Sequence, residues 1–126
     1  MTKRSTDKRA GQRASGFGKQ HVDILEQVRE AAAKQILFLP RAVNQMNAPE
    51  RLITAQEVRA AVFGGVIIEE YPEDVRGHSC LILGWGEENR PVHVVCAPKA
   101  EYLAIITAYL PSAQQWESDW RTRSRR

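Results

Sequence analysis

The segment of residues 90–111, RPVHVVCAPKAEYLAIITAYLP, most constrains how this chain can fold. It contains two runs rich in β-branched and aromatic residues, Val92–Ala97 and Tyr102–Tyr109, with a short proline-containing segment between them. Such side chains favour extended strands, and two such runs around a short loop are typical of a β-hairpin. The sequence therefore predicts a hairpin that completes a β-sheet.

Three helices are predicted before this hairpin. Apolar residues at three- and four-residue spacing indicate the first helix over residues 21–35, and a second, shorter helix follows over residues 41–46. The third helix has the clearest start, because Thr54 and Glu57 form the T-x-x-E pattern of a capping box. The chain between residues 21 and 64 is thus predicted to be mainly helical.

Two further strands and a last helix complete the predicted elements. The strands cover residues 66–71 and 79–85, and Ser112 is placed to cap a short terminal helix that carries Trp116 and Trp120 on one face. Helices and strands are segregated along the chain, with no alternation of the two. We therefore expect an α+β fold, with N-terminal helices packed on a four-stranded antiparallel sheet and a short C-terminal helix.

Charge divides the chain into three parts. Residues 1–19 contain six Lys or Arg and one Asp, a net charge of +5, and residues 116–126 contain four Arg and two acids, a net charge of +2. Because the whole chain of 126 residues carries +3, its body carries −4. We expect a basic tail at 1–19 that does not order by itself, a single domain at 20–120 and a second basic tail at 121–126.

Basic tails on an acidic body predict a polyanionic partner, with nucleic acid as the first choice. A solubilising or targeting role for the tails is the alternative. The predicted nucleic-acid-binding residues are the cations of the two tails: Lys3, Arg4, Lys8, Arg9, Arg13, Lys19, Arg121 and Arg123.

The sequence predicts a cytoplasmic protein without a cofactor or a metal. No apolar run approaches the ~20 residues of a membrane span, and no secretory signal is visible. Cys80 and Cys96 lie in apolar runs without a CxxC motif, so we expect reduced, buried thiols. His93 and Cys96 are three residues apart in one predicted strand, so their side chains point to opposite faces and cannot share a zinc ion.

His93 is the candidate acid–base residue, because an imidazole exchanges protons near neutral pH. Thr107 and Tyr109 are two residues apart in a strand, so they share a face and can offer hydroxyls to a phosphate. If His93 lies opposite Thr107, the three side chains converge, whereas a shift of one residue separates them. The sequence leaves both registers open, and it leaves open a His93 that is only part of the strand's packing.

Five motifs carry a resemblance to a known family: ITAQEV at 53–58, GGVIIEEYPED at 64–74, SCLILG at 79–84, RPVHVV at 90–95 and IITAYLP at 105–111. Together they resemble the small bacterial domain of unknown function numbered 4258, over about residues 39–123. That family resembles the RelE, barnase and colicin group of ribonuclease folds. The resemblance implies helices packed on a four-stranded antiparallel sheet.

The resemblance also implies RNA cleavage without a metal ion. On this interpretation His93 would be the general base or acid, Arg51 would bind the phosphate, and Thr107 and Tyr109 would position it. The family typically has a histidine where this chain has Arg41. An arginine stays protonated and cannot act as a base, although it can hold a phosphate.

Three functions are therefore open. The first is a toxin-type ribonuclease, attenuated by the missing histidine, whose partners are RNA, including ribosome-associated RNA, and a cognate antitoxin or other protein. The second is a noncatalytic module that binds RNA or a ribonucleoprotein through its basic tails. The third is an antitoxin-like or scaffold protein that uses the tryptophan-bearing helix as an interface.

Overall fold

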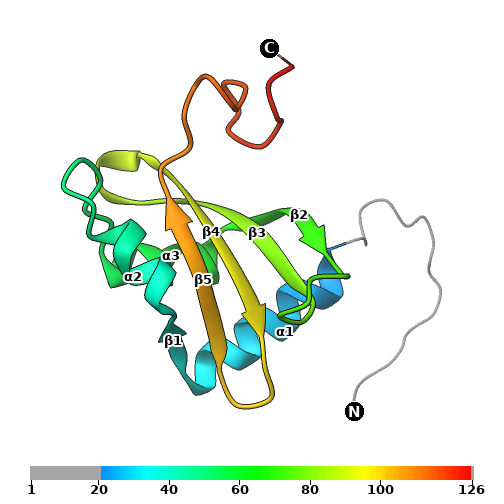
Figure 1. Ribbon diagram of the computed structural model, residues 1–126. Helices are drawn as coiled ribbons and strands as arrows, with labels where there is room; N and C mark the ends of the chain where they lie inside the picture. Colours follow the sequence, from blue (N-terminus) through cyan, green and yellow to red (C-terminus); the bar gives the residue numbers. More distant parts are fainter. Residues whose placement is uncertain (1–20, 126) are drawn as a thin grey trace.

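The computed structural model describes residues 21–125 (Figure 1). Six of the predicted nucleic-acid-binding residues lie outside this range: Lys3, Arg4, Lys8, Arg9, Arg13 and Lys19. The predicted tail at 1–19 therefore also lies outside the described residues.

Within residues 21–125, three helices and five strands make up the fold (Figure 1). The helices are α1 (Val22–Lys34), α2 (Pro40–Met46) and α3 (Ala55–Gly64). The strands are β1 (Ile36–Phe38), β2 (Val66–Tyr71), β3 (Ser79–Trp85), β4 (Pro91–Pro98) and β5 (Leu103–Tyr109), with the 3-10 helix η2 (Glu87–Asn89) between β3 and β4. The α+β class and the predicted hairpin, now β4 and β5, are confirmed.

The sheet has one strand more than predicted. Its order is β1-β5-β4-β3-β2, and all neighbours are antiparallel except β1 and β5, which are parallel. The extra strand β1 has only three residues. In the sequence this short apolar run directly follows the first predicted helix, so it resembles the end of that helix. Its pairing with Leu103–Ile105 shows that a distant strand, rather than a local pattern, makes this segment extended.

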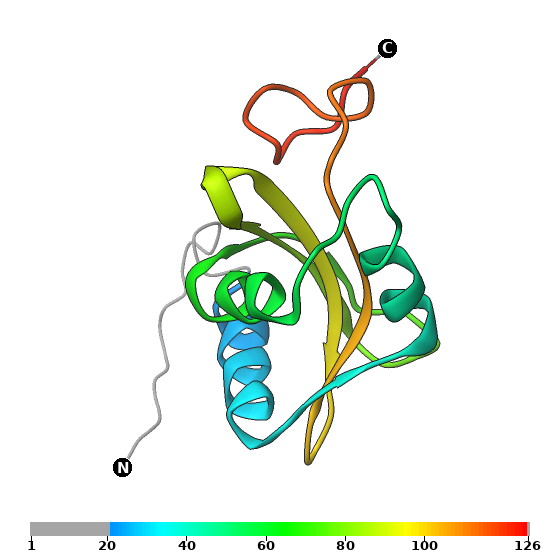
Figure 2. The ribbon, with the colours of Figure 1, turned by 90° about the vertical axis from the view of Figure 1, so that its left-hand side faces the viewer.

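Helices α1 and α3 pack on one face of the sheet, and α2 lies against β5 at the β1 edge, away from the other two (Figure 2). The core between α1, α3 and the sheet is formed by buried apolar side chains from these helices and from alternate strand residues. Helix α3 approaches β3 so closely that an added Cβ at Gly84 would lie 2.3 Å from the Cβ of Ala61. Glycine at position 84 therefore permits this helix–strand contact.

The start of α3 follows the predicted capping box. The Thr54 hydroxyl accepts a hydrogen bond from the Glu57 N–H at 3.0 Å, and the Glu57 carboxylate accepts one from the Thr54 N–H at 3.0 Å. These two bonds satisfy N–H groups that the helix leaves without a partner.

The predicted C-terminal helix is wrong. Residues 112–125 form a series of turns with an isolated antiparallel bridge between Trp116 and Arg123, and Figure 1 shows them, in orange and red, beyond the end of β5. We call this stretch, residues 112–125, the C-terminal segment. Among the described residues, no helix is long and apolar enough to cross a membrane.

Candidate functional site

The predicted acid–base residues lie together on the sheet face that α1 and α3 leave open. His93 on β4 pairs with Tyr109 on β5, and Val95 pairs with Thr107. His93 therefore lies opposite Tyr109 and not opposite Thr107. Thr107 and Tyr109 are two residues apart in β5, and side chains alternate between the two faces of a strand, so both lie on the face of His93. The hairpin register thus places His93, Thr107 and Tyr109 on one side of the sheet.

The C-terminal segment covers His93. The Trp116 ring packs edge-on against the imidazole, with centroids 4.5 Å apart and planes at 87°. The Trp120 carbonyl oxygen lies 2.7 Å from His93 Nε2. As a result, His93 has an exposed fraction of 0%.

The hydrogen bonds of His93 define its tautomer, and its burial keeps the ring neutral. A carbonyl can only accept, so Nε2 carries the proton that is donated to Trp120. Nδ1 then accepts from the Tyr109 hydroxyl at 3.2 Å. Burial lowers the pKa of His93 below its ordinary value of 6.5, although the Trp120 hydrogen bond opposes this shift. His93 is therefore a neutral imidazole whose two nitrogens both have partners.

A second polar group on the same face holds the end of the C-terminal segment. The Arg123 guanidinium donates two hydrogen bonds to the Glu69 carboxylate, at 2.8 and 3.0 Å, and lies over the Trp116 ring at 4.6 Å. The Tyr71 hydroxyl donates to the same carboxylate at 2.5 Å. The hydrogen bond from Arg123 lowers the pKa of Glu69, and burial together with Glu69 raises the pKa of Tyr71.

Sequence reasoning missed Glu69 and Tyr71. Glu69 pairs with Leu81 on β3, and Leu81 pairs with Val95 on β4, so Glu69 lies on the face of Val95 and Thr107. The two-residue spacing of Glu69 and Tyr71 in a strand was the available signal, because it places both side chains on one face. Which face that is depends on the sheet register.

A family model matches residues 39–110, which is more than half of the chain, and it describes a domain of unknown function, DUF4258. The chain belongs to this family. Among curated proteins and solved structures, none matches this DUF4258 chain. The matched region includes Glu69, Tyr71, His93 and Tyr109, whereas the C-terminal segment that covers them lies after it.

The two other arginines that the family resemblance assigned to the site are elsewhere in the DUF4258 domain. Arg41 is exposed on α2, and the Arg51 guanidinium donates to the side-chain oxygen of Gln45. Neither has a described contact with His93. Arg121 is exposed, and its N–H donates to Asp119, while Thr107 is half-buried on the His93 face.

The cysteines and the remaining histidines do not form a metal centre in the described part of this DUF4258 protein. Cys80 and Cys96 are free and buried, as predicted, and their sulfurs lie 3.9 Å apart in directly paired strands. His21 and His78 both bond the Glu70 carboxylate, at 2.6 and 2.9 Å. Within residues 21–125, no group of three or more His, Cys, Asp and Glu side chains could hold a metal ion.

Proposed function

We propose that this DUF4258 protein is a metal-independent ribonuclease whose active centre is the sheet face that carries His93 and Tyr109. One observation supports the proposal most strongly. A neutral imidazole lies 3.2 Å from a tyrosine hydroxyl, on the face that also carries the Glu69–Arg123 ion pair. Arg123 is near enough to His93 to help lower its pKa. A base, a hydroxyl and a cation are thus brought together.

These groups suit RNA cleavage through the ribose 2′-hydroxyl. The base takes the 2′-hydroxyl proton, the 2′-oxygen forms a bond to phosphorus, and the bond from phosphorus to the 5′-oxygen breaks. A water molecule gives a proton to that leaving oxygen, so the products are a 2′,3′-cyclic phosphate and a 5′-hydroxyl, and the hydroxide that is left takes the proton held by the base. We assign the base to neutral His93, stabilisation of phosphate charge to Arg123, and phosphate positioning to Tyr109 and Thr107.

RNA reaches this centre only if Trp116 and Trp120 move away from His93, while Arg123 stays on the sheet face through its ion pair with Glu69. The Trp120 carbonyl occupies Nε2 of His93, and the Trp116 ring covers the imidazole. Trp120 itself has a φ of 62°, a left-handed conformation that is costly for a bulky residue. The contacts to His93 offset this cost in the covered state, so loosening them favours an open one.

A noncatalytic RNA-binding module is the second candidate function. The observation in its favour is the 0% exposure of His93, with both ring nitrogens hydrogen-bonded. A histidine in this state can serve only to hold the C-terminal segment against the sheet. RNA would then bind through the basic tails.

RNA cleavage by the full-length chain, in excess chelator, separates the two functions. Trp116→Ala removes the side chain that covers His93, and we expect it to raise the cleavage rate about tenfold or more. Adding His93→Gln to Trp116→Ala should abolish that gain, because the base is lost. Arg41→His, which restores the histidine expected from the family resemblance, should leave the rate unchanged, because Arg41 is exposed on α2 and has no described contact with His93. Trp85→Ala is the matched control, since Trp85 is 48% exposed on β3.

The same cleavage assay can also contradict the ribonuclease proposal. If none of these proteins yields a cyclic phosphate, at concentrations that allow for a ~10⁴-fold loss of rate, the ribonuclease function is wrong. Circular dichroism and thermal melts establish that each variant is folded. Cleavage that disappears with chelator would also contradict a metal-independent reaction.

A further inference from the structure

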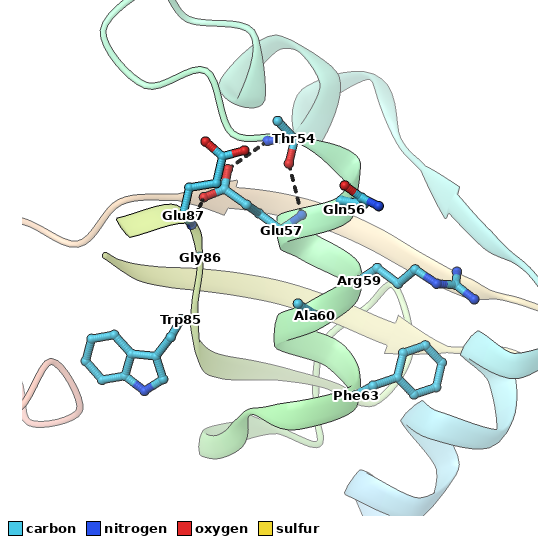
Figure 3. Close-up of a pocket in the computed structure, with 9 residues that line it drawn as sticks. All are labelled: Thr54, Gln56, Glu57, Arg59, Ala60, Phe63, Trp85, Gly86 and Glu87. Atoms are coloured by element: carbon cyan, nitrogen blue, oxygen red, sulfur yellow. Dashed lines mark hydrogen bonds between the residues drawn. The ribbon is translucent and has the colours of Figure 1, made fainter. Parts of the chain in front are cut away.

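A groove lies between helix α3 and the end of β3, on a part of the molecule that the proposed ribonuclease chemistry does not use (Figure 3). Its volume is about 550 Å³, within the range of sites that bind ligands or anchoring side chains. Phe63 and Trp85 line the groove, and they are 39% and 48% exposed. Val66 is 42% exposed and pairs with Leu83, so it shares a sheet face with Trp85 and extends this apolar surface.

A network of hydrogen bonds around Glu57 holds the groove in shape without a bound partner. Its carboxylate accepts hydrogen bonds from the N–H of Glu87, at 2.7 Å, and from the Arg90 guanidinium, at 2.9 and 3.0 Å, besides the capping bond from Thr54. An added Cβ at Gly86 would lie 2.1 Å from this carboxylate, so glycine lets the turn approach. These bonds hold η2 against α3 and fix one wall of the groove.

The same network argues against a small polar ligand. Small-molecule sites usually place a few unsatisfied polar groups around an apolar cavity. Here the Glu57 carboxylate is already bound by two backbone N–H groups and a guanidinium. The Arg59 guanidinium lies over the Phe63 ring at 5.3 Å from its centroid. The exposed aromatic side chains therefore suit an apolar side chain of a larger partner.

The charge beside the groove selects the kind of partner. Glu87 lines the groove and Glu88 follows it on η2; both are exposed, and they outnumber Arg59, the exposed cation of the lining. Glu57 and Arg90 neutralise each other. Two exposed carboxylates repel the phosphates of RNA and attract Lys or Arg side chains. An aromatic surface with an acidic rim is thus complementary to a basic, partly apolar protein segment.

We propose that this groove docks a basic segment of a partner protein. An aromatic or aliphatic side chain of the partner would insert between Phe63 and Trp85, and its flanking Lys or Arg side chains would face Glu87 and Glu88. The proposal does not depend on ribonuclease activity.

Selection of peptides from a random displayed library on the full-length protein tests this proposal. We expect enriched peptides to combine an aromatic or aliphatic residue with flanking Lys or Arg. Synthetic copies should bind about tenfold or more weakly to Trp85→Ala and to Phe63→Ala, as anchoring aromatic residues commonly do. Glu87→Lys with Glu88→Lys should weaken them further, and Val75→Ala, at a residue 99% exposed, is the control.

Several results would overturn the proposal. Acidic peptides, peptides whose binding ignores Trp85, or an absence of enriched peptides would each do so. A synthetic peptide of residues 1–20 and a single-stranded RNA oligonucleotide are tested as competitors. If either displaces the selected peptides from the groove, the occupant is this chain's own basic segment or RNA, and not a partner protein.

Discussion

The imidazole of His93 is neutral in the folded protein, because burial lowers its pKa below 6.5. In the unfolded chain the same group takes up a proton as the pH falls through its ordinary pKa. Between these two pKa values the unfolded state binds a proton that the folded state does not, so acid favours unfolding. The stability that neutral His93 contributes is therefore present above pH 6.5 and is lost below it.

We accordingly predict that the free energy of unfolding falls as the pH is lowered from about 7 to about 5. In His93→Gln this fall should be much smaller, because glutamine does not titrate. Urea unfolding at several pH values measures the fall in the free energy of unfolding. His78→Gln is the control, because His78 is an exposed histidine. Parallel curves for the wild type and His93→Gln would contradict a buried, neutral His93.

Glu57 is the second residue whose role is set by its surroundings. Burial by itself would raise its pKa, but the hydrogen bonds from Arg90, Thr54 and Glu87 outweigh burial and hold the pKa at about 2. Glu57→Gln removes the charge from a buried network, and we expect it to lower the free energy of unfolding by about 2–3 kcal/mol.

Chemical denaturation measures this loss. Glu87→Gln is the matched control, because Glu87 takes part through its backbone N–H and its side chain is exposed. It should change stability by less than about 0.5 kcal/mol. Equal effects of the two substitutions would show that the Glu57 network is not a stabilising unit.

At the scale of elements, the close packing of α3 on β3 can be tested at two glycines. An added Cβ at Gly84 would meet Ala61, whereas one at Gly64 would meet nothing within 4 Å. Gly84→Ala should therefore destabilise the protein by about 1–3 kcal/mol through overpacking. Gly64→Ala should be neutral or stabilise by up to about 1 kcal/mol, because alanine favours a helix. Thermal melts of both variants decide whether the contact is as tight as described.

The C-terminal segment is a second element whose packing can be tested. The Glu69–Arg123 ion pair is largely exposed on the arginine side, so Glu69→Gln should change global stability by less than about 1 kcal/mol. Its effect should instead be local, as faster amide exchange in residues 112–125. Glu73→Gln, an exposed glutamate after β2, is the control. Unchanged exchange in Glu69→Gln would mean that this ion pair does not hold the segment.

For the whole molecule, charge distribution governs how RNA would be attracted. The six cations of residues 1–19 precede a body of net charge −4, so RNA binding should weaken steeply as salt is raised. We predict that deleting residues 1–19, or replacing their six cations with glutamine, flattens this salt dependence. Fluorescence polarisation with a labelled RNA measures it. An unchanged slope in both variants would place the RNA-binding cations elsewhere.

Local signals in the sequence were enough for several elements. The Thr54–Glu57 capping box begins α3, and the β-branched runs around residues 98–101 form the β4–β5 hairpin. Each signal acts between residues close in the chain, so spacing and side-chain type suffice to recognise it. The α+β class and the shared face of Thr107 and Tyr109 follow from the same short-range periodicity.

Other features depended on residues far apart in the sequence. Strand β1 exists because it pairs with β5, and the Trp116–Trp120 spacing, which resembles a helix, belongs to a turn segment held by contacts to His93 and to Glu69 through Arg123. These contacts span tens of residues and depend on the sheet register, which no local pattern specifies. The sequence by itself thus determined most of the elements and singled out His93 as the candidate acid–base residue. Only the tertiary structure decided that this residue is covered, because burial is a property of packing between distant segments.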